Sequence, residues 1–452
     1  MMKRSSFEMR FPFPLQQEGR PRSFNRLMTA NITQHSIVGI TAYDTPFVLS
    51  DDARRRHLHI VGQTGSGKST LILNLIAQDL AAHRGVALLD PHGELAEQAL
   101  TLIPTDRAHQ LVYLNPSDHE RPIGFNVLEA VAPDYRATVA DGVVSGFKHV
   151  WPEFWGPRLE YILLNATLAL MDAQGSTLLG LPRLLVDEAY RAHILAHCRD
   201  PVVRGFWINE YNAYDRRFRN EAIAPIQNKI GRLLATPALR NMLAQPKSTI
   251  NVRRMMDEQR ILIVNLSKGA LGESTAHLLG AFLTTAIAHA ALSRADLPEA
   301  ERQPFYLFAD EFQTYASDSF ALVLSEARKY ALALTLGHQY LGQLPLQLRQ
   351  AVLGNTGSVI SFRVGAEDAP LLASHIGIEN QSALKDLANF RAIGKFLTAG
   401  TPSEPKFLTM LAAPKAINHR PHKLIANSRI RFGRDRATIE AKVAKFLGAH
   451  AR

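Results

Sequence analysis

A glycine-rich segment offers the clearest chemistry in this sequence. The letters GQTGSGKST match the pattern G-x-x-x-x-G-K-[ST], in which backbone N–H groups surround phosphate oxygens and the lysine reaches the β- and γ-phosphates of a nucleotide. The hydroxyl after the lysine is a ligand for Mg²⁺. We therefore expect ATP and Mg²⁺ as cofactors, with Lys68 on the phosphates and Ser69 on the metal. The predicted nucleotide-binding residues are Gly62, Gln63, Thr64, Gly65, Ser66, Gly67, Lys68, Ser69 and Thr70.

Two acidic runs could supply the second half of a hydrolytic site. Hydrolysis needs carboxylates at a strand end, where they hold Mg²⁺ and orient the attacking water. The run YLFADE has the length of a strand, so we expect Asp310 in the metal shell and Glu311 as the base, with a structural acidic turn as the alternative. The run LLVDE places Asp187 and Glu188 in a helical pattern that starts near Pro182, which favours a solvated helix face.

Three further polar residues are weaker candidates for the same site. Gln339 ends the run LALTLGHQ, where its amide would lie beside Glu311 and could sense the γ-phosphate. Arg328, in SEARKYA, falls on the helix between those two strands, a poor position for its own nucleotide but a good one for a neighbouring subunit's. A plain surface arginine is the alternative for Arg328. Asp90, in LLDPHGEL, ends another strand and could support the site.

Short apolar runs alternate with helical patterns and must position these side chains. Such alternation predicts an α/β fold with a mainly parallel sheet, in which the strand ends gather at one edge. Two later runs, FRAIGKFLTAG and PKFLTMLAAP, predict an antiparallel pair. The predicted strands of the alternating part are HLHIVG, GVALLD, LVYLN, ILIVNL, FYLFADEF, LALTLGHQ and SVISFRV.

The alternation is interrupted once, and the interruption suggests how the chain is divided. Residues 1–50 read as a basic arm followed by short strands, and residues 51–118 as the first half of the α/β domain. Long helical patterns fill 119–257, which we interpret as an all-α insertion. The second half of the α/β domain then covers 258–415, and a basic tail with one helix covers 416–452.

The composition restricts the class of protein and its partners. The chain has 452 residues, of which 46% are hydrophobic and 20% charged, which excludes a disordered or fibrous protein. Its net charge of +10 favours a polyanionic partner such as nucleic acid or an anionic membrane face, with a merely basic tail as the alternative. Arg216, Arg217 and Arg219 are a candidate phosphate-binding cluster, although a solvated helix face explains a single charge run better.

Cysteine, histidine and apolar residues point to a reducing compartment without a bound metal cluster. The single cysteine, Cys198, cannot form an intrachain disulfide or a CxxC site. The histidines have no metal-ligand spacing. No run reaches the roughly 18 apolar residues that a spanning helix needs, so we expect a cytoplasmic protein without a transmembrane segment.

Several motifs in a fixed order resemble one protein family. The segments HLHIVGQTGSGKST, LLDPHGEL, NLSKGALG, FADEFQTYAS, SEARKYALAL and GHQYLGQL are similar to those of the FtsK/HerA superfamily of P-loop DNA pumps. Within it, they most resemble the type IV secretion coupling proteins of the conjugative TraG/TraD type and their soluble relatives. The resemblance covers about 55–400, and the order DEFQ, EARKY, HQ is its most specific part.

The resemblance implies an ATPase with a RecA-like motor domain that forms a ring, usually of six subunits, and threads DNA through its centre. Coupling proteins usually carry N-terminal membrane helices, which this chain lacks, so a soluble relative with a separate membrane, nuclease or relaxase partner is implied. A motor for protein cargo and a nucleotide-dependent assembly switch are the alternatives. The roles that carry over are nucleotide and Mg²⁺ binding for Lys68 and Ser69, the second acidic motif for Asp310 and Glu311, the sensor for Gln339, the arginine finger for Arg328, and a supporting role for Asp90.

Overall fold

The strand patterns form a single eleven-stranded sheet in the computed structural model, which describes residues 35–448 apart from 130, 317–319 and 399. The basic arm predicted at the start of the chain lies outside the described residues. The strands are β1 (His35–Thr41), β2 (Pro46–Ser50), β3 (Leu58–Val61), β4 (Gly85–Asp90), β5 (Leu111–Leu114), β6 (Ile261–Asn265), β7 (Phe305–Ala309), β8 (Leu332–His338), β9 (Ser358–Ser361), β10 (Arg391–Lys395) and β13 (Lys406–Thr409). A small separate hairpin contains β11 (Leu397–Thr398) and β12 (Thr401–Pro402).

The sheet has a parallel part and an antiparallel part. Its strand order is β2-β1-β13-β10-β9-β3-β8-β7-β4-β6-β5. All neighbours from β9 to β5 pair in parallel, whereas β10, β13, β1 and β2 extend the sheet with antiparallel pairs. The mainly parallel α/β fold predicted from the sequence is therefore confirmed, as is the antiparallel pairing of the two late runs.

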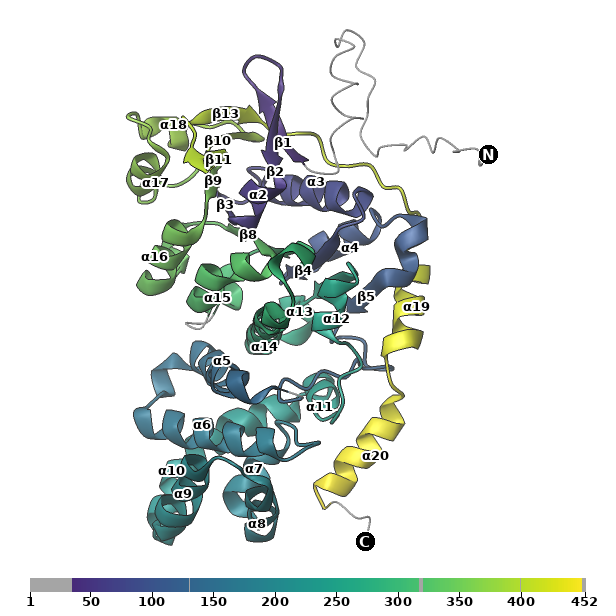
Figure 1. Cartoon of the computed structure of the whole chain (residues 1–452), viewed down its shortest axis with the longest axis vertical. Coiled ribbons are helices and arrows are strands. Elements are labelled where there is room, and N and C mark those ends of the chain that lie inside the picture. The colour runs from purple at the N-terminus through teal and green to yellow at the C-terminus, as the bar shows by residue number, and fades with distance from the viewer. Residues whose placement is uncertain (1–34, 130, 317–319, 399, 449–452) are drawn as a thin grey trace.

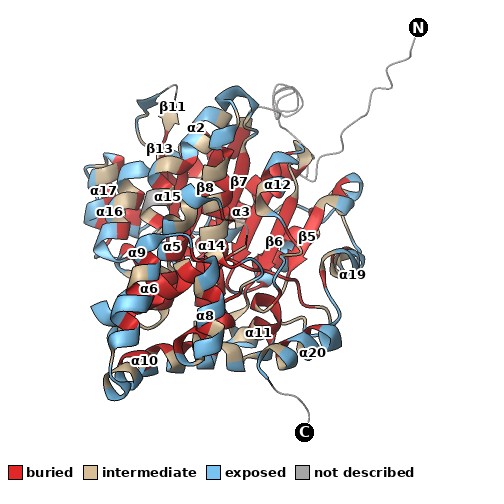
Figure 2. Cartoon of the chain, turned by 60° about the horizontal axis from the view of Figure 1, so that its bottom comes forward, coloured by how far each residue is buried: buried red, intermediate tan, exposed pale blue. Residues whose placement is uncertain are grey.

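Both faces of the central strands are buried, which is why these strands are apolar at successive positions. Along β4, Val86 and Leu88 pack on the face covered by α3 (Lys68–Ala81) and α4 (Glu94–Leu100), while Ala87 and Leu89 point to the other face. That other face is covered by α14 (Glu273–Leu292). A parallel sheet between two helical layers needs this continuous apolar pattern. Figure 2 shows central strands such as β5, β6 and β7 in the red of buried residues.

The remaining helices of the α/β part surround the sheet and connect its strands. They are α2 (Asp51–Arg55), α13 (Lys268–Leu271), α15 (Phe320–Glu326), α16 (Leu346–Asn355), α17 (Ala369–Ile376) and α18 (Ser382–Lys385). Glycine allows α14 to lie close to its neighbours: a Cβ on Gly142 of α5 (Arg136–Val150) would come within 2.5 Å of Thr285 of α14. The helical segment Glu273–Asp296, which includes α14, is long and apolar enough to cross a membrane. However, 72% of its most apolar 18-residue stretch is buried inside the protein.

Helices from the middle of the chain form a second body at one end of the molecule (Figure 1). Its close contact with the sheet part runs through α5, which packs on α14. The helices of this body are α5 (Arg136–Val150), α6 (Pro157–Asp172), α7 (Gly180–Val186), α8 (Glu188–His197), α9 (Pro201–Gly205), α10 (Arg216–Ala235) and α11 (Pro237–Leu243). Helix α12 (Val252–Asp257), which follows them in the chain, contacts α14 of the sheet part.

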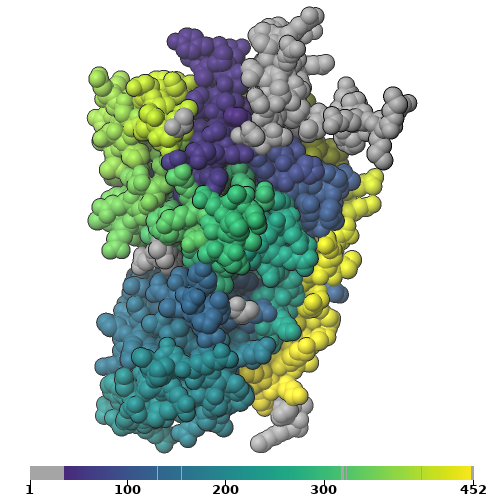
Figure 3. All heavy atoms as spheres, in the orientation of Figure 1, coloured from purple at the N-terminus to yellow at the C-terminus, as the bar shows by residue number. Residues whose placement is uncertain are grey.

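The C-terminal segment joins the two bodies along one side of the molecule, as Figure 3 shows. Helix α19 (Pro421–Phe432) packs against β5 and α4 of the sheet part. Helix α20 (Arg436–Phe446) then reaches the helical body, where Ile439 and Val443 bury their side chains against Leu179. The predicted C-terminal helix is therefore present, and it contacts the helical body.

Two histidines form a buried pair between adjacent strands of the sheet. His59 of β3 and His338 of β8 are both fully buried, and their Nε2 atoms lie 2.6 Å apart. The Nδ1 atom of His338 lies 3.1 Å from the carbonyl oxygen of Tyr340. Because a carbonyl only accepts, the network assigns the proton of His338 to Nδ1, so that its Nε2 accepts from His59. Burial holds the pKa of His59 well below its usual value and lowers the pKa of His338 to about 4.

Acidification should destabilise the fold through this pair. An unfolded histidine titrates near pH 6.5, so below that pH the unfolded chain binds protons that the folded pair does not. The free energy of unfolding should therefore fall as the pH drops from about 6.5 towards the pKa of about 4 for His338, by an amount on the order of 3 kcal/mol. Urea unfolding between about pH 5 and 7.5 measures this dependence.

A matched pair of variants isolates the contribution of the buried histidines. His59→Leu removes one of the two groups, so its stability should depend less steeply on pH than that of the wild type. His83 is exposed, with 66% of its side chain accessible, and His83→Leu should leave the slope unchanged. Equal slopes for the wild type and His59→Leu would contradict this account of the pair.

Candidate active site

The glycine-rich segment forms the connection between β3 and α3. Gly67 has a φ of 121°, a value that side-chain-bearing residues rarely adopt, and it immediately precedes the first residue of α3. A Cβ on Gly62 would come within 2.5 Å of the Cβ of Phe362, so only glycine fits there. The loop therefore depends on glycine both for its backbone conformation and for its packing against Phe362, the residue that follows β9.

Hydrogen bonds to the ends of the neighbouring strands hold this loop in place. The N–H of Gln63 donates to the carbonyl of Arg363 at 2.8 Å, and the N–H of Gly62 donates to the carbonyl of His338 at 3.3 Å. Within the loop, the hydroxyl of Ser66 donates to the carbonyl of Gln63 at 2.7 Å. The loop is thus tied to the ends of β8 and β9 on both sides of β3.

The side chain of Lys68 binds the carbonyl groups of the loop. Its side chain is buried, and Nζ donates to the carbonyls of Gly62 at 2.6 Å and Gln63 at 3.3 Å. Burial lowers the pKa of the ammonium, while the nearby carboxylates of Glu311 and Asp310 act in the opposite direction. Ser69, the next residue, is exposed at the start of α3. The loop therefore has the lysine, hydroxyl and helix N-terminus that a phosphate group requires.

Asp310 follows β7, two strands away from the loop, and its carboxylate is buried. A Cβ on Gly337 would lie 3.1 Å from Oδ1 of Asp310, which places this carboxylate over β8. Oδ1 is buried and has no hydrogen-bond partner in the described part of the chain. Burial, followed by the charges of Glu311 and Asp90, raises the pKa of Asp310 to about 7. An unpartnered oxygen in an acidic cluster is suited to a hard divalent cation, so the residues present fit Mg²⁺.

The Glu311 carboxylate is oriented by two amides. Nε2 of Gln339 donates to one carboxylate oxygen at 3.0 Å, and Nε2 of Gln313 donates to the other at 2.6 Å. Glu311 itself has a φ of 45°, and the hydroxyl of Tyr315 donates to the carbonyl of Asp310 at 2.6 Å, which holds the turn. The predicted proximity of Gln339 and Glu311 is therefore present in the structure.

Asp90 supports the same edge from β4. Its carboxylate is fully buried and accepts from the N–H groups of His92 at 2.8 Å and Ala96 at 2.9 Å. These bonds fix the turn into α4, and the negative charge contributes to the raised pKa of Asp310. The charge of Asp90 thus acts on Asp310, and its hydrogen bonds fix the turn between β4 and α4.

Arg328 lies away from these residues. Helix α15 ends at Glu326, and Arg328 belongs to the following short turn, η9 (Ala327–Tyr330), rather than to the predicted helix. It precedes β8, whereas Gln339 follows β8, so the two lie at opposite edges of the sheet. Its side chain is 45% exposed and forms a long ion pair, 3.7 Å, with Asp52.

The competing acidic run has a structural role. Asp187 separates α7 from α8, and its carboxylate caps α8 by accepting from the N–H of Tyr190 at 2.9 Å. It also pairs with Arg183 at 2.7 Å. Glu188 is exposed in the first turn of α8. The run LLVDE is thus a helix junction, and its first carboxylate is a cap rather than part of a continuous helix face.

The arginine run on α10 is divided between solvent and the chain itself. Arg217 is 91% exposed and pairs with Glu221 one turn later at 3.2 Å. Arg219 donates to the carbonyls of Asn212 and Tyr214, both at 3.2 Å, and so stabilises the segment before α10. These contacts explain Arg217 and Arg219 as residues of the helix surface.

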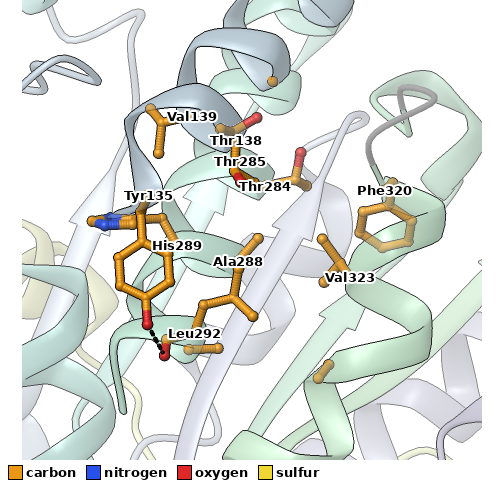
Figure 4. A pocket seen from close by; sticks show the side chains of 13 residues that line it. Tyr135, Thr138, Val139, Thr284, Thr285, Ala288, His289, Leu292, Phe320 and Val323 are labelled. Atoms are coloured by element: carbon orange, nitrogen blue, oxygen red, sulfur yellow. Dashed lines mark hydrogen bonds between the residues drawn. The ribbon is translucent and has the colours of Figure 1, made fainter. Parts of the chain in front are cut away.

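An apolar pocket lies at the junction between the helical body and the sheet part (Figure 4). It is lined by α5, α14 and α15, and none of its described lining residues belongs to residues 62–70. The hydroxyl of Tyr135 donates to the carbonyl of Leu292 at 3.1 Å, and the ring of Tyr135 packs edge-on against His289. This pocket belongs to the packing of α5 against α14.

Two features of the site have no signal in the sequence pattern. The pairing of His59 with His338 joins strands that are distant in the chain, and histidines in apolar runs show no motif. Phe390 lies against Gly67, although nothing in its local sequence predicts contact with the loop. Only the strand order β10-β9-β3 brings residue 390 to the loop.

Comparisons with known proteins address the family and the fold. A family model described as type IV secretion-system coupling protein DNA-binding domain matches residues 45–381, about three quarters of the chain. No curated protein matches this sequence. The unbound bacterial conjugative coupling protein TrwBdeltaN70 is similar with a TM-score of 0.61 and 16% identity, covering 87% of this chain and 93% of that one.

Two other solved structures have the same architecture. The plasmid coupling protein TrwB in complex with ADP and Mg²⁺ has a TM-score of 0.61 and 17% identity, covering 88% of this chain and 94% of that one. VirB4 of Thermoanaerobacter pseudethanolicus has a TM-score of 0.56 and 15% identity, covering 84% and 97%. At these identities the likeness is one of fold, whereas the family model covers most of the sequence. The predicted family is thereby confirmed, and the chain belongs to the type IV secretion-system coupling protein DNA-binding domain family.

Proposed function

We propose that this protein is a Mg²⁺-dependent ATPase that moves DNA. It acts as a ring of six subunits, and ATP is hydrolysed between neighbouring subunits. The observation that carries the proposal is the meeting of Lys68, Asp310 and the Gln339–Glu311 hydrogen bond at one sheet edge. A lysine-bearing loop beside an acidic pair is what nucleotide hydrolysis requires. The matched family, described as a DNA-binding domain, supports DNA as the proposed substrate.

Binding would use the loop and the two groups that fit a metal. Lys68 exchanges its bonds to the carbonyls of Gly62 and Gln63 for the β- and γ-phosphates. The hydroxyl of Ser69 and the unpartnered oxygen of Asp310 would hold Mg²⁺. Bound there, Mg²⁺ supplies positive charge that neutralises the phosphate oxygens. The solved TrwB structures with ADP and Mg²⁺ and with a non-hydrolysable ATP analogue support this choice of ligands.

Hydrolysis would depend on the orientation of Glu311. Because the amides of Gln339 and Gln313 each hold one of its carboxylate oxygens, the carboxylate is fixed where it can accept a proton from the attacking water. Gln339 directly follows β8, so a change in its partner when the γ-phosphate leaves is transmitted to that strand. In this proposal Gln339 is the sensor and Glu311 the base.

A ring would complete the site from the next subunit. Arg328 is exposed at the edge opposite its own Lys68, and a guanidinium there cannot act on its own nucleotide. Head-to-tail contacts that close into a ring join different faces of neighbouring subunits. Arg328 therefore serves the neighbour's nucleotide, and its weak ion pair with Asp52 leaves it available for that contact.

Glu311→Gln should retain ATP but hydrolyse it at least a hundredfold more slowly, because only the water-orienting charge is lost. Lys68→Ala should lose both binding and turnover, because its contact with the phosphates is removed. Nucleotide binding by calorimetry and phosphate release together distinguish the two variants. Glu188→Gln, in the competing acidic run, is the matched control and should behave as the wild type. Normal turnover by Glu311→Gln would place the base elsewhere.

DNA binding should be independent of sequence and should weaken steeply with salt, because each phosphate neutralised by Lys or Arg releases counterions. Affinity measured on duplex and single-stranded oligonucleotides should fall by orders of magnitude between about 50 and 200 mM salt. ATP turnover should rise when DNA is added. A salt-independent affinity, or no binding at low salt, would contradict DNA as the cargo and favour protein cargo.

Arg328→Ala should bind ATP and still assemble, yet hydrolyse ATP about three to five orders of magnitude more slowly, the usual effect of losing an arginine finger. Mixing it with Lys68→Ala after subunit exchange should restore part of the activity, because some interfaces then pair an intact Lys68 with an intact Arg328. Lys329→Ala is the matched control, since Lys329 is an exposed neighbour paired with Glu326. Full activity of Arg328→Ala alone would contradict this role and would mean that Arg328 is only a surface residue.

A further inference from the structure

Phe390 connects the nucleotide loop to the antiparallel part of the sheet. It immediately precedes β10, and its N–H donates to the carbonyl of Ser66 in the loop at 2.8 Å. Its own carbonyl accepts from the N–H of Met410, just after β13, at 2.9 Å. The backbone of this residue is therefore fixed on both sides, and its ring has a defined position relative to the loop.

The conformation of Phe390 is unusual for an aromatic residue. Its φ is 62°, in the left-handed region that bulky side chains rarely adopt. Residues in sparsely populated backbone regions persist only where the surroundings over-determine them, and they gather at ligand-binding sites. The two backbone hydrogen bonds to Ser66 and Met410 supply that constraint here.

The ring combines contact with the loop and exposure to solvent. A Cβ on Gly67 would lie 3.1 Å from Cδ1 of Phe390 and 3.1 Å from Cε1 of Phe362, so both rings border Gly67. Phe362 is completely buried, whereas Phe390 remains 47% exposed. An aromatic ring beside Gly67, the residue that precedes the phosphate-binding helix, thus keeps part of its surface open.

The chain after β13 continues from Phe390 along α3. Asn74 of α3 donates to the carbonyl of Ala412 at 3.0 Å and to that of Thr70 at 3.0 Å. Phe390 and residues 410–412 therefore lie next to the first turns of α3. The base of a nucleotide is joined to its α-phosphate through a single ribose, so a base attached to phosphates in this loop must rest close to the same turns.

The geometry points to Phe390 as the platform on which the purine base of the bound nucleotide stacks. This inference rests on the proposed binding of a nucleoside triphosphate to the loop and adds the subsite for its base. Aromatic rings stack on the face of any base, because every base has a π-face. Stacking on Phe390 therefore gives affinity without distinguishing adenine from guanine, and ATP and GTP should bind with similar affinity.

The test compares ATP with inorganic tripolyphosphate, which has the phosphates but no base. With Mg²⁺ present, calorimetry on Phe390→Ala should show ATP binding weakened by about ten- to a hundredfold, the effect of losing one base–aromatic stack. Binding of tripolyphosphate should be unchanged. Phe390→Trp should retain ATP affinity. Phe407→Ala is the matched control, because Phe407 is a similarly exposed ring on β13, 55% accessible, and lies opposite Ile393 of β10.

A second readout does not depend on the alanine variant folding. In Phe390→Trp, ATP should change the indole emission and tripolyphosphate should not, relative to the wild type with its three tryptophans. Equal weakening of both ligands by Phe390→Ala would overturn the inference, because the residue would then only support the loop. Unchanged ATP affinity would also overturn it. Failure of the wild type to bind either ligand would instead contradict the proposed nucleotide binding itself.

Discussion

The parallel register of the central strands is the constraint on which the rest of the structure depends. Strands β3, β8, β7 and β4 are consecutive neighbours in the sheet and run in the same direction, so their carboxyl ends meet at one edge. Each of those ends carries a polar residue of the site, and in an open α/β sheet this edge is where ligands bind. Residues up to 271 positions apart are brought together in this way: Lys68, Gln339, Asp310 and Asp90.

The same constraint explains why Arg328 and Asp310 have different relations to the nucleotide. A residue that follows a strand reaches the loop's edge, whereas one that precedes a strand lies at the opposite edge. Asp310 is of the first kind and Arg328 of the second. One subunit therefore presents an acidic, lysine-bearing edge and, on its other edge, an exposed guanidinium. This arrangement supports a site shared between subunits, which is the reason for proposing a ring.

Much of the fold and of the candidate site could be predicted because local patterns carry them. The loop is defined by consecutive residues around Lys68, and the strand-end rule then places Glu311 and Gln339 together, as their 3.0 Å hydrogen bond bears out. Long-range features were not predictable in the same way. The pairing of His59 with His338 and the contact of Phe390 with Gly67 follow from strand order, which no short sequence pattern encodes. The junction at Asp187 was missed because a cap between two short helices has the same apolar spacing as one helix.

A structure with a non-hydrolysable ATP analogue and Mg²⁺ tests the central claim most directly. The account predicts that Nζ of Lys68 leaves the carbonyl of Gly62, where it now lies at 2.6 Å, and contacts the phosphates. It also predicts a metal ion within reach of Ser69 and Asp310, with Glu311 facing the γ-phosphate. A complex in which Lys68 keeps its bond to Gly62 while the phosphates bind elsewhere would contradict the account.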